Sequence, residues 1–109
     1  MNNNNFVKIT TTGEVQNSES KMKKVKLNEE LEICVAYVEG NYYAIGDVCT
    51  HAGCSLSDGL LEGYEVECMC HGSKFDVRYG SVTNSPAVNP EPRYELKVED
   101  ENILIKIPK

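Results

Sequence analysis

The sequence predicts an all-β protein with one turn-rich insert, and three observations lead to this class. Short runs rich in β-branched residues stand at both ends of the chain. No segment has the apolar spacing of an amphipathic helix; residues 21–31 come nearest and hold too few apolar positions. Most glycines and prolines, and four of the five cysteines, fall between Gly46 and Pro92. Two β-rich ends therefore frame a loop-rich region, where binding sites are usually found.

The expected strands occur in pairs along the chain. Polar turns at 39–41 and 99–102 separate neighbouring apolar runs, and each turn predicts a hairpin. The first five residues, one Met and four Asn, are expected to be a disordered terminus. The predicted strands are residues 6–9, 25–27, 33–38, 42–45, 94–98 and 103–107.

Size and charge limit the possible functions. With 109 residues the chain forms a single domain, 1–109, in which the insert spans about 46–92 and the scaffold 6–45 and 93–107. A net charge of −6 argues against nucleic acid as a partner. There is no apolar run of the roughly 20 residues that a membrane span needs, and the N-terminus lacks the features of a signal peptide, which predicts a cytoplasmic protein.

The acidic charge is concentrated in one stretch. Residues 27–73 contain nine acidic side chains and no Lys or Arg, which is typical either of a solvated face or of a surface that steers a basic partner. The nine are Glu29, Glu30, Glu32, Glu39, Asp47, Asp58, Glu62, Glu65 and Glu67.

Both histidines of the chain stand beside cysteines. Cys49 and His51 form a C-x-H motif, and after sixteen residues Cys68 and His71 form C-x-x-H. Neighbouring glycines (Gly46, Gly53 and Gly72) allow tight turns, and we expect the backbone N–H groups of these turns to point inward, toward a negatively charged centre. Cys₂His₂ is also a zinc set, but zinc modules usually pair cysteines in one knuckle. One thiolate and one imidazole from each loop suit a two-iron cluster.

The region around these motifs resembles the cluster signature of Rieske [2Fe–2S] proteins. Almost the whole chain shares the resemblance, which implies a Rieske-like three-sheet antiparallel β-sandwich with a small cluster-binding subdomain inserted between strands. It implies one [2Fe–2S] cluster per chain, with Cys49 and Cys68 on the inner iron and His51 and His71 on the outer one. A loop containing Ser85, Pro86 and Ala87 would cover the cluster. The matching segments are 41–47, 49–54, 68–76, 75–80 and 85–87.

The resemblance assigns the other cysteines and a tuning residue. Cys54 and Cys70 stand where respiratory and photosynthetic members carry a disulfide between the cluster loops, and ferredoxins of dioxygenase systems usually lack that pair; two reduced thiols are the alternative. Cys34 lies in an apolar run, typical of a small buried side chain. Ser73 matches a serine whose hydroxyl reaches a cluster sulfide in high-potential members, and Phe75 replaces a tyrosine. We therefore expect an intermediate potential within the roughly −150 to +300 mV Rieske range.

The resemblance implies electron transfer and no catalysis. No histidine is left to hold the mononuclear iron of an oxygenase, and no Gly-rich dinucleotide fingerprint is present. The predicted function is a soluble, monomeric one-electron carrier between a reductase and an acceptor such as an oxygenase or a respiratory component. A small subunit of a larger, nitrite-reductase-like complex, a redox sensor and a structural zinc protein remain as alternatives.

Overall fold

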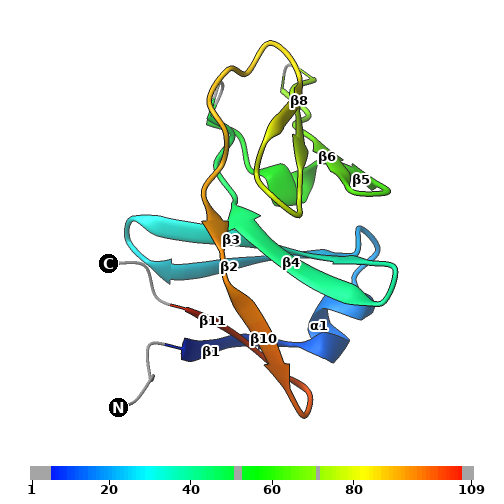
Figure 1. Ribbon diagram of the computed structural model, residues 1–109, viewed down its shortest axis with the longest axis vertical. Coiled ribbons are helices and arrows are strands. Elements are labelled where there is room, and N and C mark those ends of the chain that lie inside the picture. Colours follow the sequence, from blue (N-terminus) through cyan, green and yellow to red (C-terminus); the bar gives the residue numbers. More distant parts are fainter. Residues whose placement is uncertain (1–5, 51–52, 71, 107–109) are drawn as a thin grey trace.

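Three antiparallel sheets make up the protein in the computed structural model, which describes residues 6–50, 53–70 and 72–106 (Figure 1). Their strand orders are β1-β11-β10, β2-β3-β4-β9 and β5-β6-β7-β8. The predicted all-β class with three antiparallel sheets is thus confirmed. The strands are β1 (Phe6–Thr11), β2 (Met22–Asn28), β3 (Leu31–Val38), β4 (Asn41–Gly46), β5 (Leu60–Glu62), β6 (Glu65–Glu67), β7 (Lys74–Asp76), β8 (Val82–Asn84), β9 (Arg93–Tyr94), β10 (Leu96–Glu99) and β11 (Asn102–Lys106).

The β2-β3-β4-β9 sheet forms the middle layer and is buried on both faces at β3. Ile33 and Val35 belong to one core, shared with Ile103 and Ile105 of β11. Cys34, between them on the strand, faces the other side of the sheet. There it belongs to a second core, which also contains Leu56, Cys68 and Phe75. Alternate side chains of a strand point to opposite faces, so this continuous apolar run joins both outer sheets to one layer. The expectation that Cys34 is a small buried side chain is confirmed, because none of its surface is exposed.

Both expected hairpins are present. Glu39 and Gly40 connect β3 to β4 with φ values of 52° and 85°, the left-handed pair that tight two-residue hairpins use. The β10–β11 hairpin turns at Asp100, whose φ is 58°. The predicted strand 94–98 is divided, since Tyr94 pairs with β4 in one sheet and Leu96 with β11 in another. The chain thereby moves from the middle sheet to the outer one within three residues.

The small β5–β8 sheet lies between β4 and β9 in the chain and at one end of the molecule (Figure 1). A 3₁₀ turn, η1 (Leu56–Asp58), leads into it and buries Leu56 in the second core. The turn after β7 packs closely on the returning chain: Gly80 has φ 81°, and Glu91 N–H donates to its carbonyl at 2.8 Å. A Cβ at Gly80 would lie 2.2 Å from the Glu91 carbonyl oxygen, so only glycine fits.

One short helix was not expected. The α1 helix (Thr12–Gln16) has five residues, and Thr11 caps it by accepting the Glu14 N–H at 3.3 Å. Residues 21–31, rightly not predicted as helix, contain β2. The described part of the chain has no helix long and apolar enough to cross a membrane. The expected disordered terminus, residues 1–5, and the last residue of the strand predicted at 103–107 lie outside the described residues.

Candidate metal centre

Two loops at the end of the β5–β8 sheet contain the predicted ligands, and the same pattern of backbone hydrogen bonds is found in both. In the first loop, Cys49 N–H donates to the Cys54 carbonyl at 2.8 Å, and Gly53 N–H donates back to Cys49 at 2.9 Å. In the second loop, Cys68 N–H donates to the Ser73 carbonyl at 2.8 Å, and Gly72 N–H donates back to Cys68 at 2.9 Å. Cys49 and Cys68 therefore occupy equivalent positions in two copies of one turn.

The glycines close each turn because both have left-handed backbones. Gly53 has φ 78° and Gly72 has φ 80°, a conformation that costs other residues about 1–2 kcal/mol. The N–H groups of all three glycines are used in backbone hydrogen bonds. Those of Gly53 and Gly72 donate to the cysteine carbonyls of their own loops, and that of Gly46 donates to Pro92. These glycines shape the loops, and their amides are used to close the turns and to tie β4 to the returning chain.

Burial separates the cysteines by role. Cys49 and Cys68 are 2% and 0% exposed and pack in the second core with Leu56 and Phe75. They hold the loop bases against the sheet, as rigid thiolate ligands require. His51 and His71, the other two predicted ligands, lie outside the described residues.

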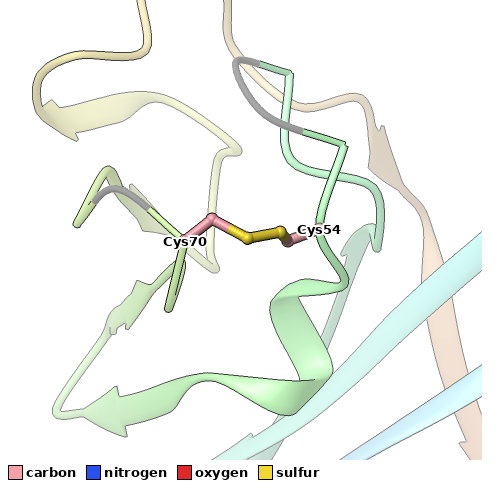
Figure 2. The surroundings of a disulfide bond; sticks show 2 residues. All are labelled: Cys54 and Cys70. Atoms are coloured by element: carbon pink, nitrogen blue, oxygen red, sulfur yellow. A yellow bond between two sulfur atoms is a disulfide. The ribbon is translucent and has the colours of Figure 1, made fainter.

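A disulfide joins the two loops in the structure (Figure 2). It links Cys54 to Cys70 with Cα atoms 6.4 Å apart, within the usual range for the bond. The Cys68 sulfur lies close by, because the three sulfur atoms of Cys54, Cys68 and Cys70 are all within 4.8 Å of one another. The bridge therefore spans the loops directly beside a predicted ligand.

The segment around Pro86 braces both loops. Ala87 N–H donates to the Ser73 hydroxyl at 3.0 Å, and neither residue is more than 3% exposed. The Thr50 hydroxyl donates to the Asn89 carbonyl at 2.7 Å. Ser85 and Pro86 are joined by a cis peptide bond, and both are exposed. The loop predicted to cover the centre thus touches the first ligand loop through Thr50 and the second through Ser73.

Two buried carboxylates under the first loop were not predicted. Asp47 was counted with the acidic face, yet it is fully buried, and its Oδ1 accepts the Ser57 N–H at 2.8 Å. Glu91 is 4% exposed, and burial raises its pKa to about 7, with the Asp47 charge adding to the rise. A hydrogen bond from the Thr50 backbone opposes that rise. Nothing local signals this burial, because Glu91 stands between two prolines in a polar segment.

The arrangement suits a metal centre built from two equivalent loops. Each loop offers one buried thiolate from the first position of its turn, and the sequence adds one histidine to each. The donor set fits a two-iron cluster whose irons have different ligands, and the second core keeps its inner side dry. These residues can hold a redox centre close to one end of the molecule.

The chain matches known proteins over nearly all its length. The Rieske [2Fe-2S] domain family matches residues 5–103. The ferredoxin component of naphthalene 1,2-dioxygenase/salicylate 5-hydroxylase systems from Ralstonia sp is 39% identical over 83 residues, 76% of this chain and 79% of the relative.

Two solved structures share the fold at full length. The complex of reduced oxygenase and oxidized ferredoxin in carbazole 1,9a-dioxygenase contains a chain with a TM-score of 0.85 and 29% identity, covering 95% of this chain and 94% of that one. The Sphingomonas yanoikuyae B1 ferredoxin gives a TM-score of 0.86 at 25% identity, covering 94% and 98%. The full-length coverage means that scaffold and loops match together.

Proposed function

The chain belongs to the Rieske [2Fe–2S] domain family, and from that premise we propose that it is the ferredoxin component of a dioxygenase system. Its cofactor is a Rieske [2Fe–2S] cluster, and it is an electron carrier with no catalytic step of its own. In this proposal the protein takes one electron from a reductase and delivers it to a Rieske oxygenase. The kinship with dioxygenase-system ferredoxins supports the oxygenase, and not a respiratory component, as the acceptor.

The proposal rests on the backbone hydrogen-bond pattern that the two ligand loops have in common. Cys49 and Cys68 would hold one iron from equivalent buried positions, and His51 and His71 would hold the other. When bound, the cluster supplies reversible one-electron transfer. Ser73 supports the site because its hydroxyl oxygen accepts from Ala87, which leaves its proton available for a cluster sulfur. Residues 46–92 form the cluster-binding subdomain in this account, and the remainder forms the scaffold.

The disulfide is part of the proposal. Cys54 and Cys70 would remain bonded in the functional protein and hold the loops at a fixed separation. The cell compartment we propose is the cytoplasm, where most disulfides are reduced, so this bond must be protected by its setting. Cys54 is half-buried and packs against the second core, whereas Cys70 is exposed, so the protection would come from the Cys54 side of the bond.

The loop-bearing end has a surface suited to transient docking. Each of the three loops presents one exposed apolar side chain: Val48 is 46% exposed, Met69 60% and Val88 82%. Both ligand loops belong to the acidic stretch 27–73, which contains no Lys or Arg. Apolar contacts with an acidic surround favour a partner whose docking site is apolar and rimmed by basic residues.

A stopped-flow experiment tests the function. The reduced holoprotein is mixed with an oxidised Rieske oxygenase from a dioxygenase system, and bleaching and recovery of the visible cluster bands are followed. We expect bimolecular transfer that slows as ionic strength rises, because opposite charges steer the encounter. Met69→Gln should slow transfer several-fold, since the exposed apolar contact is lost.

The matched control is Val98→Gln, which removes another exposed apolar side chain, on β10 of the scaffold and away from the loops. It should transfer at the wild-type rate. Equal rates for the two variants would contradict docking through the loops. Stable co-purification of the protein as a stoichiometric subunit of a larger reductase would contradict the mobile-carrier function itself.

A further inference from the structure

A pocket of about 370 Å³ lies between the small sheet and the scaffold, and none of its lining residues belongs to the three loops of the metal centre. Three separate segments form its walls: β4, the turn after β7, and the β9–β10 junction. The volume falls within the range of small-molecule sites. The lining residues are Tyr42, Tyr43, Ala44, Val77, Arg78, Tyr79, Arg93, Tyr94 and Leu96.

The composition of this pocket is unusual for the chain. Arg78 and Arg93 are the only arginines in the sequence, and both line it. Four of the six tyrosines line it as well. In a protein with a net charge of −6, a general attraction for anions is absent, so any anion affinity must come from such a local pair of guanidinium groups.

Arg78 is fixed in place. Its Nε and Nη2 donate to the two carboxylate oxygens of Asp76 at 3.1 and 2.8 Å. The guanidinium carbon lies 3.9 Å from the centre of the Tyr64 ring and 5.1 Å from that of Tyr79. Asp76 offsets most of the Arg78 charge. The N–H groups on Nη1 take no part in the two hydrogen bonds to Asp76. Arg78 therefore offers preoriented hydrogen-bond donors.

Arg93 supplies the uncompensated charge. It pairs with Ile45 on the edge of the middle sheet and is exposed. Within the part of the chain that the structure describes, no ion pair involves it. Because both guanidinium groups line the same pocket, they could share one planar carboxylate.

We propose that this pocket binds an aromatic carboxylate. The carboxylate would lie on Arg93 with donors from Arg78, and the ring would pack against the tyrosine walls, chiefly Tyr79, which is 62% exposed. Guanidinium groups also bind phosphate, but flat aromatic walls match a planar ring better than a hydrated tetrahedral ion. The site is separate from the metal loops, so this inference does not rest on the proposed electron-transfer function.

Ligand-observed saturation-transfer NMR on the holoprotein tests the site, with benzoate as the probe. We expect saturable binding near the millimolar range, about −4 kcal/mol, as is typical of a single ring and one charged contact. Benzamide lacks the charge, cyclohexanecarboxylate lacks the flat ring and inorganic phosphate lacks a ring altogether. Each should bind at least about tenfold more weakly, which is about 1.4 kcal/mol.

Two variants and a control complete the test. Arg93→Gln should weaken benzoate binding about tenfold, and Tyr79→Leu should remove the preference for benzoate over cyclohexanecarboxylate. Lys106→Gln changes an exposed residue at the end of β11, outside the pocket, and should bind benzoate like the wild type. Absence of saturation by benzoate, an unchanged affinity in Arg93→Gln, or phosphate binding as tightly as benzoate would each overturn the proposal. Unchanged circular dichroism of the variants establishes that they are folded.

Discussion

Replacing Ser73 by alanine tests the hydrogen bond that this hydroxyl makes in the structure together with the cluster contact that we propose for it. Its oxygen accepts the Ala87 N–H at 3.0 Å, and both residues are buried. In our proposal its proton would then be available to the cluster, as the family resemblance implies. Ser73→Ala removes both interactions and changes no charge on the chain. The variant should therefore be less stable and have a lower reduction potential.

The magnitudes follow from the burial. The Ala87 N–H would be left without its acceptor in a dry site, which costs about 1–3 kcal/mol of unfolding free energy. A hydrogen bond to a more negative acceptor is stronger by roughly 1–1.5 kcal/mol, so losing it disfavours the reduced state by that amount. For one electron, about 1.4 kcal/mol corresponds to about 59 mV. The potential should fall by about 40–60 mV.

Protein-film voltammetry gives the potential, and denaturant unfolding gives the stability. Ser81→Ala is the matched control, because Ser81 is exposed and its hydrogen bond from Asp76 N–H is accepted by the backbone carbonyl, which the substitution keeps. It should leave both values unchanged. A Ser73→Ala variant that loses stability but keeps the wild-type potential would refute the tuning role, and Ser73 would then only brace the covering loop.

Three further substitutions test the scaffold of the site. Glu91 has a pKa raised to about 7 by burial, so its contribution to stability is full below pH 4.5 and is lost as pH rises through 7. Between pH 5 and 8 the free energy of unfolding of the wild type should fall by about 2–3 kcal/mol relative to that of Glu91→Gln, measured by urea unfolding at each pH. If the two proteins instead showed the same pH dependence, the Glu91 carboxylate would not be the group responsible for it. Cys54→Ser should cost about 3 kcal/mol for a closed loop of this length, and a reductant should bring the wild type down to the variant but leave the variant unchanged. Gly80→Ala should lower the melting temperature well beyond Gly63→Ala, since both have positive φ but only Gly80 has a carbonyl 2.2 Å from the added Cβ; equal losses would show that the close approach relaxes freely.

The strands and hairpins could be predicted because their signals are local. Residues 33–38 are β-branched and apolar, and the turn at Glu39 and Gly40 follows at once. The α1 helix could not be found this way, because five residues are too few to show a helical period. The break at Glu95 depends on which sheet each neighbour joins, and that is a tertiary property.

The spacing of the cysteines was enough to propose Cys49 and Cys68 as ligands, but it did not predict what surrounds them. Asp47 appeared to belong to an acidic face and is buried, because η1 folds back so that the Ser57 N–H meets its carboxylate. The Glu91 carboxylate is buried against Gly46, where an added Cβ would lie 2.6 Å from Oε1, and these two residues are far apart in sequence. The pocket of Arg78 and Arg93 likewise combines distant segments that have no shared motif. Such contacts arise only when the insert packs against the scaffold.

Pulsed electron paramagnetic resonance of the reduced protein tests the central claim most directly, because it detects nitrogen bound to the cluster. We expect a reduced [2Fe–2S] signal with an average g value below that of the free electron and with strong coupling to two imidazole nitrogens, from His51 and His71. Each histidine-to-cysteine substitution should remove one of those couplings. A cluster signal without directly bound nitrogen, or a purified protein that holds zinc and gives no signal, would contradict it.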